Sequence, residues 1–194
     1  MAPKPRVTRD MIVDASLALI RENGAEALNA RNVARRLNCS TQPVLYHFIS
    51  MEELRRAVYD RADRFHTEYL LRPGGERDPL LTIGVNYIRF AVEEPRLFRF
   101  LFQSGCARET TIAEMIDSPA LSPVLSAMSQ GMGTDMEKTK KAFLILALFA
   151  HGYASIIANN NLQYDEETVA ADLERAFIGA VAAVGQEDNN EKTL

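Results

Sequence analysis

Residues 29–48 read NARNVARRLNCSTQPVLYHF, and this segment carries most of the information about the architecture. Asn29 is a good helix N-cap, and Val33 and Leu37 follow it at the spacing of one helical face. Asn38 tolerates the left-handed backbone of a sharp turn better than other non-glycine residues. The segment therefore predicts a short helix that ends in a tight turn.

A second helix is expected to begin with Ser40 as its N-cap. Pro43 then lies in the first turn, where its missing N–H removes no intrahelical bond. At 100° per residue, Val44, His47 and Phe48 share the arc that packs on the preceding helices. The opposite arc is free to enter a groove and carries Thr41, Gln42, Leu45 and Tyr46.

The side chains of this outward arc fit the edges of a nucleic-acid duplex. Thr41 and Gln42 can hydrogen-bond to base edges, Leu45 can touch a thymine methyl, and Tyr46 can reach a phosphate. Backbone charge would come from an N-terminal arm and from the preceding helix, with Lys4, Arg6, Arg31, Arg35 and Arg36. The alternative is a pair of short helices in any helical protein, with arginines that are merely solvated.

Helical periodicity continues through the rest of the chain. It predicts a helix closed by Gly24, a long helix through residues 54–69, another over 83–94, and a shorter one from Pro95. Glycines and prolines over residues 104–133 leave room only for short helices.

Two long helices are expected to complete the chain. Thr134 and Glu137 have the spacing of a capping box that opens a helix of about 25 residues. The last helix begins near Asp165 and runs to Gly185, followed by a polar tail. Because no alternating strand pattern occurs, the predicted fold class is all-α.

The charge of the chain is unevenly distributed. Formal net charge is −4 over 194 residues, yet residues 1–61 carry 10 Lys and Arg against 7 Asp and Glu, and residues 62–194 carry 12 against 19. This indicates a small polyanion-binding head on a body that binds something else. The start lacks a signal peptide, and the longest apolar run, residues 142–150, is too short for a membrane helix, so we expect a cytoplasmic protein with no membrane partner.

Features of enzymes are weak in this sequence. His47, His66 and His151 belong to different predicted helices and lack paired metal-ligand spacing, and no phosphate- or dinucleotide-binding fingerprint occurs. We therefore expect no metal, no cofactor and no enzymatic activity. A helical enzyme that uses Cys106 as nucleophile remains an alternative, although a lone cysteine without an evident base is usually inert.

The body has apolar residues that suggest self-association and a ligand pocket. The last two helices carry stripes that would pair with a second copy in a four-helix interface, namely Phe143, Ala147, Ala150, Ala154, Ile157, Val169, Leu173, Phe177 and Ala180. The alternative is that these stripes pack only inside one chain. Candidates for an effector pocket are Phe65, Tyr69, Tyr87, Phe90, Phe98, Phe102, Met115, Met128 and His151, and the alternative is plain core.

Residues 8–58 resemble the DNA-binding domain of the TetR/AcrR family of transcriptional regulators. The resemblance rests on the run from Ser40 to Phe48 and on the sequence SMEEL at residues 50–54. Three positions depart from the usual pattern: Leu45 stands where the family has Tyr, Met51 where it has a phosphate-binding Lys, and Asn38 where it has the turn Gly.

The remainder resembles the WHG-type regulatory domain of one branch of these regulators. The resemblance covers residues 87–102 and the sequence AHG at residues 150–152, which keeps the His and Gly of the motif but not its Trp. In such proteins the C-terminal helices bind a small effector and form a homodimer.

Together these observations predict a helix-turn-helix domain over residues 1–50, a helical effector-binding and dimerisation domain over 51–185, and a polar tail over 186–194. The resemblance implies a transcriptional repressor that binds a double-stranded operator as a homodimer, through residues 4, 6, 31, 40–43 and 45–47. A small-molecule effector would release it. The alternative function is a helical small-molecule carrier or interaction module whose head has lost useful DNA affinity.

Overall fold

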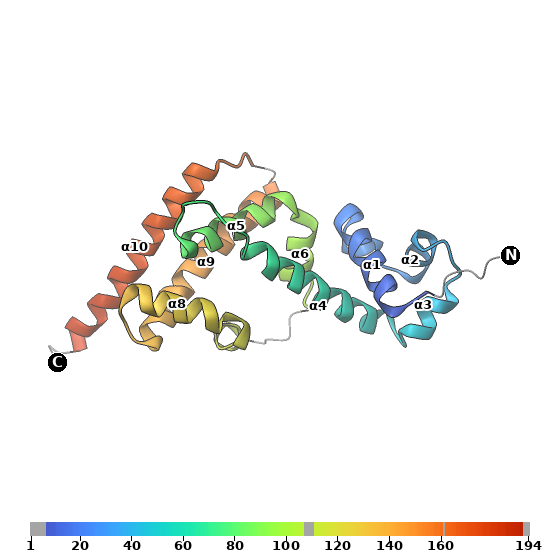
Figure 1. Ribbon diagram of the computed structural model, residues 1–194, viewed down its shortest axis with the longest axis horizontal. Coiled ribbons are helices and arrows are strands. Elements are labelled where there is room, and N and C mark those ends of the chain that lie inside the picture. Colours follow the sequence, from blue (N-terminus) through green and yellow to red (C-terminus); the bar gives the residue numbers. More distant parts are fainter. Residues whose placement is uncertain (1–6, 107–110, 161, 192–194) are drawn as a thin grey trace. The chain divides into compact units, whose positions relative to one another are not determined.

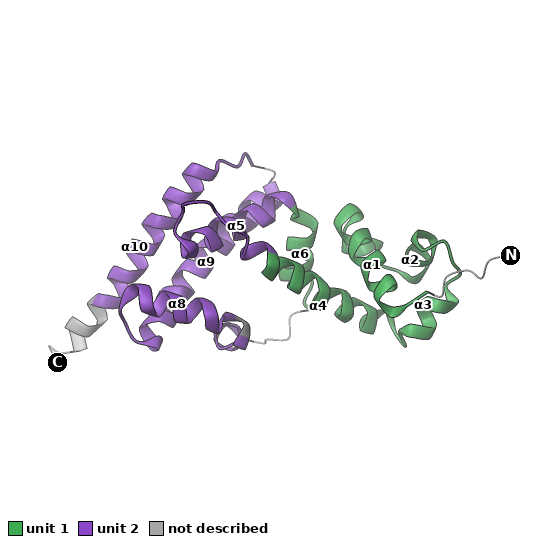
Figure 2. Ribbon diagram, viewed as in Figure 1, with its two compact units in different colours: residues 1–68, 94–107 green, residues 69–93, 108–194 purple. Residues whose placement is uncertain are grey.

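The computed structural model of the chain describes residues 7–106, 111–160 and 162–191. All regular elements in these ranges are helical (Figure 1), which confirms the all-α prediction. The contacts divide the chain into two compact units (Figure 2), one of residues 1–68 and 94–107, the other of residues 69–93 and 108–194.

The first unit is built around the N-terminal helices. Its elements are α1 (Arg9–Asn23), the 3₁₀ turn η1 (Ala25–Ala27), α2 (Ala30–Arg36), α3 (Gln42–His47), most of α4 (Met51–Leu70) and α6 (Pro95–Gln103). Its core contains the fully buried side chains of Ile12, Ile20, Val33, Val44, Phe48, Leu54 and Val58. The helix α6 packs on α1, and the guanidinium of Arg21 bonds to the carboxylate of Glu94 beside that contact.

The second unit is a bundle of longer helices. Its elements are α5 (Pro79–Glu93), α7 (Ile112–Ile116), the 3₁₀ turn η2 (Pro119–Leu121), α8 (Ser122–Met132), α9 (Met136–Asn160) and α10 (Glu166–Glu191). Helices α5, α9 and α10 pack on one another, and α8 packs on α9. Gly84 permits the close approach of α5 to α10, because a Cβ there would lie 3.2 Å from a methyl carbon of Leu173.

The predicted cap of the second short helix is wrong. The helix α3 begins at Gln42, with Thr41 rather than Ser40 as N-cap, and it has no side-chain capping bond. An N-cap side chain accepts from the N–H two or three residues later. Pro43 occupies the later of these positions and has no N–H to give.

Two other predicted helix ends also differ from the structure. The cap of α9 is Asp135 rather than Thr134, because the Asp135 carboxylate accepts from the N–H of Lys138 at 2.9 Å. The last helix continues to Glu191 instead of ending at Gly185. Polar residues after an apolar stripe do not by themselves stop a helix, and no proline or capping motif interrupts the sequence there. Residues 192–194 of the predicted tail lie outside the described residues.

Candidate nucleic-acid interface

The turn between α2 and α3 is fixed by local hydrogen bonds. The Asn29 side chain caps α2 by accepting from the N–H of Asn32 at 2.9 Å. Asn38 takes the left-handed conformation with φ +51°, as predicted. The N–H of Cys39 then reaches back to the carbonyl of Ala34 at 3.0 Å. This is a Schellman motif with Asn in place of Gly, and it sets the direction in which α3 leaves the turn.

The rotation of α3 about its axis is set by two buried side chains. Val44 and Phe48 are almost fully buried. The guanidinium of Arg9 lies over the Phe48 ring, 4.3 Å from its centroid, and bonds to Glu53 at 3.2 Å. These contacts hold α3 against α1 and the start of α4, so the predicted outward arc does face away from the core.

The outward face of α3 combines one amide with large apolar groups. Gln42 is exposed, and Leu45 and Tyr46 are 57% and 76% exposed. Ile49, just after the helix, is 96% exposed and was not among the residues predicted for this face. Ser40 is also exposed, and Thr41 and Pro43 are partly buried beside them. The predicted outward residues therefore lie together on one face.

His47 has a second role that its sequence position did not reveal. Its Nε2 lies 3.0 Å from the backbone carbonyl of Val7, 40 residues earlier. Its ring also makes an edge contact with Tyr46 at a centroid distance of 5.3 Å. His47 thus anchors the residue that leads into α1 and supports the exposed Tyr46 ring.

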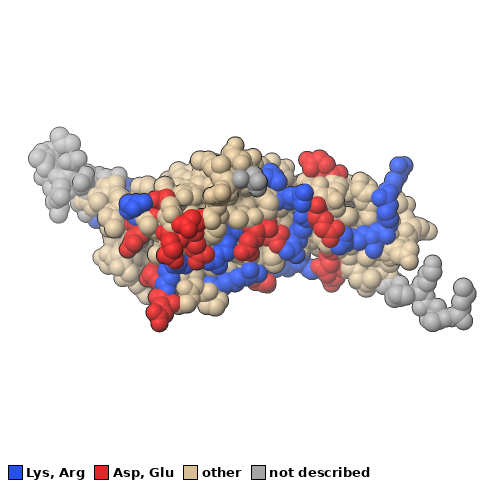
Figure 3. Space-filling view, turned by 90° about the horizontal axis from the view of Figure 1, so that it is seen from above, with Lys and Arg blue, Asp and Glu red and all other residues tan. Residues whose placement is uncertain are grey.

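The arginines of α2 differ in how free they are. Arg31 and Arg35 are exposed and form no ion pair with the described residues. Arg36 forms a two-bond pair with Glu22, at 2.7 and 2.8 Å, and this bonding lowers the pKa of the Glu22 carboxyl. Acidic and basic side chains are interspersed over the face in Figure 3. Lys4 and Arg6 lie outside the described residues.

The start of α4 is capped without a cation. The Ser50 hydroxyl accepts from the N–H of Glu53 at 3.1 Å, and the Glu53 carboxylate accepts from the N–H of Ile49 at 2.9 Å. Met51 is the first residue of the helix and is partly exposed. This arrangement orders the segment that follows the outward face.

The predicted effector residues belong to both compact units. In the first unit, the tilted rings of Phe98 and Phe102 have centroids 4.9 Å apart, and Phe65 lies under the guanidinium of Arg21. In the second unit, the rings of Tyr69 and Phe90 pack 5.2 Å apart. Met128 belongs to the core beside α9, whereas Met115 on α7 is largely exposed.

Tyr87 and His151 form a polar pair inside the second unit. The Tyr87 hydroxyl lies 2.8 Å from Nδ1 of His151, linking α5 to α9. Burial raises the pKa of Tyr87 and lowers the pKa of His151. Both shifts favour the neutral form of the two groups.

An open depression of about 460 Å³ lies on the first unit, lined by Leu17, Arg61, Arg64, Phe65 and Glu68. Phe65 is the one predicted effector residue in it. Arg61 bonds to the carboxylates of Asp10 and Asp14 beside the depression.

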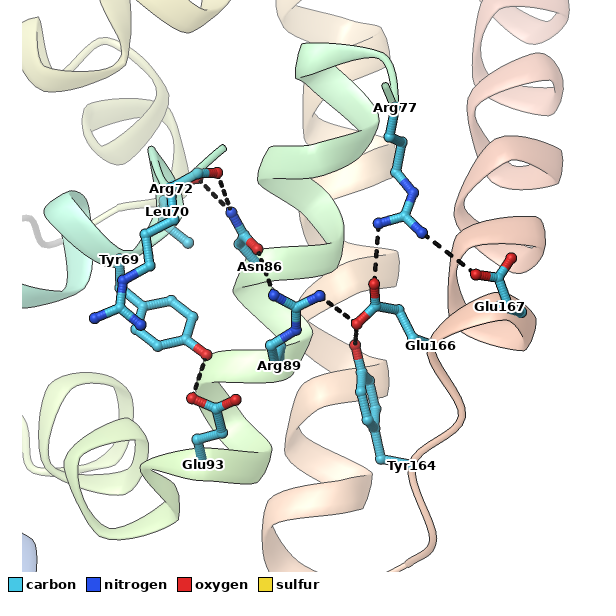
Figure 4. A network of polar contacts seen from close by, with 10 residues as sticks. All are labelled: Tyr69, Leu70, Arg72, Arg77, Asn86, Arg89, Glu93, Tyr164, Glu166 and Glu167. Atoms are coloured by element: carbon cyan, nitrogen blue, oxygen red, sulfur yellow. Dashed lines mark hydrogen bonds and ion pairs between the residues drawn. The ribbon is translucent and has the colours of Figure 1, made fainter. Parts of the chain in front are cut away.

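A polar network in the second unit connects the end of α4 to the start of α10 (Figure 4). The buried Asn86 amide donates to the carbonyls of Leu70 and Arg72 at 3.0 and 2.9 Å. Arg89 donates to the Asn86 carbonyl oxygen at 3.4 Å and also bonds to Glu166. The bond from Arg89 lowers the pKa of the Glu166 carboxyl, which keeps the ion pair charged.

Most residues predicted for a dimer interface are core residues of a single chain. Ala150, Ala154, Ile157, Val169, Leu173 and Ala180 are buried within the second unit, and Phe143 and Phe177 pack against its core cluster. The contacts among α5, α9 and α10 cover the buried side chains within one chain, whereas Ala147 is partly buried, so an interface through these residues stays a prediction.

A different apolar face of the same helices stays uncovered. On α9 it comprises Ile145, Leu148, Phe149, the exposed Gly152 and Ile156. The last four follow Ile145 by three, four, seven and eleven residues, which is the spacing of one helical face. On α10 it comprises Ile178 with Gly179, Ala182 and Ala183. We call these residues the α9–α10 outer face. In the sequence these residues form a second apolar stripe. Spacing alone does not show which of the two stripes is buried.

Comparisons with known proteins point to one family. Residues 12–58 match the model described as "Bacterial regulatory proteins, tetR family". No curated protein matches the chain. A tetR-family transcriptional regulator from Streptomyces coelicolor has a similar structure, with TM-score 0.72 and 16% identity over 100% of this chain and 87% of that one.

Two further solved structures share the fold. A TetR variant from Acinetobacter baumannii AYE, in complex with minocycline, has TM-score 0.59 and 15% identity over 93% of this chain and 97% of that one. A TetR family transcription regulator from Marinobacter aquaeolei VT8 has TM-score 0.61 and 16% identity over 87% and 93%. Residues 12–58 are therefore similar to the N-terminal domain of tetR-family bacterial regulatory proteins, and the chain as a whole shares the all-helical fold of these solved structures.

Proposed function

We propose that this protein is a ligand-responsive transcriptional repressor that binds a pseudo-palindromic operator as a homodimer and leaves it when a small molecule binds. The observation that carries the proposal is the outward face of α3. Its polar and apolar side chains are exposed while Val44 and Phe48 anchor the helix from behind. A recognition helix needs this division between an anchored back and an exposed front.

Each element of the interface has a distinct role in the proposal. Thr41 and Gln42 contact base edges at the start of α3, and the Tyr46 hydroxyl contacts a phosphate. Arg31 and Arg35 supply charge toward the DNA backbone, because no described carboxylate pairs with them. Arg36 contributes less, since Glu22 already holds its guanidinium.

The second copy of the chain is proposed to cover the α9–α10 outer face. Ile156 and Ile178 are 56% and 62% exposed there, and the neighbouring Gly152, Gly179 and Ala182 allow close helix approach. A two-fold pair would present two copies of α3 to a palindromic site, about 34–36 Å apart.

The membrane offers a competing explanation for the same apolar side chains. Among the described helices, α9 is long and apolar enough to cross a bilayer by length and composition. A single such helix is weak evidence, and its N-terminal part carries Lys138, Lys140 and Lys141. Covering by a second copy also explains why α10 contributes to the face, which a lone membrane helix would not.

The effector is proposed to bind among the helices that follow the reading head. The Tyr87–His151 pair offers a neutral hydrogen-bonding group within an apolar surrounding. His151 and Gly152 are also the residues that carry the likeness to the WHG-type regulatory domain, so we propose that subtype for the body. The Acinetobacter baumannii TetR variant was crystallised with minocycline, which supports a small organic molecule as the class of effector.

Selection of duplexes tests the proposal. The full-length protein is incubated with fragmented genomic DNA, bound duplexes are enriched, and the affinity for the enriched duplex is measured at several salt concentrations. We expect a pseudo-palindromic site and an affinity that falls steeply with salt. Indifference to all duplexes would overturn the proposal and favour the carrier or interaction module instead.

A pair of matched variants distinguishes loss of DNA binding from loss of folding. Replacement of exposed Gln42 and Tyr46 by alanine should abolish enrichment while leaving the thermal transition and the oligomeric state unchanged. The control is the double replacement of Gln130 and Leu71, which are equally exposed but lie in the second unit. If this control loses enrichment to the same degree, α3 is not the reading element.

A further inference from the structure

Leu45 is an unusual residue to find on the exposed front of a recognition helix. Its side chain is 57% exposed and cannot turn inward, because Val44 and Phe48 fill the core on the other side of α3. The guanidinium of Arg9 over Phe48 and the Val7 carbonyl at His47 hold the helix in this rotation. Leu45 therefore presents an aliphatic group, with no hydrogen-bonding atom, toward whatever the face contacts.

The chemistry of the major groove limits what such a group can meet. Adenine, guanine and cytosine present donors and acceptors there, and thymine alone adds an apolar C5-methyl group. A leucine placed over a polar base edge would remove water from that edge without replacing its hydrogen bond. Over a thymine methyl it buries apolar surface on both sides.

We infer that Leu45 makes the protein select a thymine methyl in each operator half-site. The inference rests on the proposed function and deepens it by naming the base feature that the half-site must contain. The methyl, rather than the identity of the base pair, is the recognised group, so a 5-methylcytosine presents the same feature.

The spacing along α3 places this thymine relative to the base read by Gln42. Leu45 follows Gln42 by three residues, which is about 4.5 Å along a helix axis. Successive bases of one strand are about 3.4 Å apart. The selected thymine therefore lies one or two base pairs from the position that depends on Gln42.

Deoxyuridine substitution tests the inference, because it removes only the methyl group. In the enriched duplex each thymine is replaced in turn by deoxyuridine, symmetrically in both half-sites, and the dissociation constant is measured for the full-length protein. We expect substitution at one symmetric pair of positions to weaken binding roughly tenfold or more. Each lost methyl contact should weaken binding about three- to fivefold, and the two half-sites multiply this factor. At that position, cytosine should bind worse than 5-methylcytosine.

The variant L45A completes a double-mutant cycle. It should weaken binding to the thymine duplex and bind the thymine and deoxyuridine duplexes equally well. The control L71A removes a leucine of similar exposure in the second unit and should keep the discrimination. Because Leu45 is exposed, L45A is expected to keep the thermal transition of the parent protein.

The outcomes distinguish the inference from the function on which it rests. If a duplex is enriched but no deoxyuridine substitution weakens binding, the inference is overturned and the proposed function stands. If the discrimination persists in L45A, another residue recognises the methyl and the inference is again overturned. Failure to enrich any duplex would overturn both.

Discussion

The side-chain amide of Asn86 donates a hydrogen bond to the backbone carbonyl of Leu70, the last residue of α4, at 3.0 Å. Asn86 is almost fully buried in the middle of α5. The same amide also reaches the carbonyl of Arg72 at 2.9 Å, so one side chain satisfies two carbonyls that the end of α4 leaves open. Helix α4, which begins just after α3, thus has its C-terminal end fixed within the second unit.

The substitution N86A is expected to destabilise the fold. It leaves the carbonyls of Leu70 and Arg72 without their donor and should lower the free energy of unfolding by about 1–3 kcal/mol. Urea denaturation measures this change. The exposed Asn23 at the end of α1 provides the control N23A, expected within about 0.5 kcal/mol of the parent. Equal effects of the two variants would show that the carbonyls are not held by Asn86.

The arginines of α2 should differ in their effect on salt dependence. Removing a phosphate contact lowers the slope of log affinity against log salt by about 0.9. We therefore expect R31A and R35A to reduce the slope and to weaken all duplexes alike. R36A should change it less, because Glu22 holds that guanidinium. A larger effect of R36A than of R35A would contradict this division.

The variant Q42A should act at one place in the operator. Loss of a hydrogen bond to a base edge is expected to cost roughly 1–3 kcal/mol at one symmetric position and little elsewhere. Affinities for a panel of single-base variants of the enriched duplex measure this. A uniform loss across the panel would mean that Gln42 contacts the backbone or only supports the helix.

A charge on the α9–α10 outer face should separate the proposed dimer. I156D or I178D places a carboxylate where the second copy would bury apolar surface. Sedimentation should then report a monomer, and circular dichroism should report unchanged helicity. The control I112D adds the same charge at an isoleucine of similar exposure on α7. The dimer proposal fails if I156D and I178D sediment like the parent protein.

His66 should make the fold sensitive to mild acid. Burial lowers its pKa to about 4, against about 6.5 in an unfolded chain. Between these values the unfolded state binds more protons than the folded state, so stability falls as pH decreases from 6.5 toward 4. At pH 5 the loss relative to pH 7 should be about 2 kcal/mol.

The variant H66Q identifies the source of this pH dependence. Its free energy of unfolding should change less between pH 7 and pH 5 than that of the parent, with His151 accounting for part of the remainder. Urea denaturation at both pH values provides the comparison. An unchanged pH dependence in H66Q would assign the effect to other groups.

Local sequence rules predicted most features of the helix-turn-helix segment formed by α2 and α3. Asn29, Asn38, Val44 and Phe48 take the cap, turn and core positions expected of them, because each depends only on backbone geometry within a few residues. The Ser40 cap failed through an equally local effect, the missing N–H of Pro43. The anchoring of His47 by Val7 was not predictable, since 40 residues separate the two partners.

In the second unit, helical periodicity could not predict which apolar side of a helix is buried. Helix α9 is apolar on two sides, one holding Ala150 and Ala154 and the other Ile145 and Ile156. Sequence spacing identifies both stripes but cannot rank them, because the choice depends on the positions of α5 and α10. The side that meets other helices of the same chain becomes core, and the remaining side stays exposed.

Footprinting on the enriched duplex tests most directly whether paired copies of α3 read a major groove. The full-length protein and Q42A are compared by methylation and hydroxyl-radical protection at equal saturation. We predict two protected patches on one face of the duplex, centred about 10 base pairs apart, with base protection selectively lost in Q42A. A single patch, or base protection identical in Q42A and the parent protein, would contradict the account.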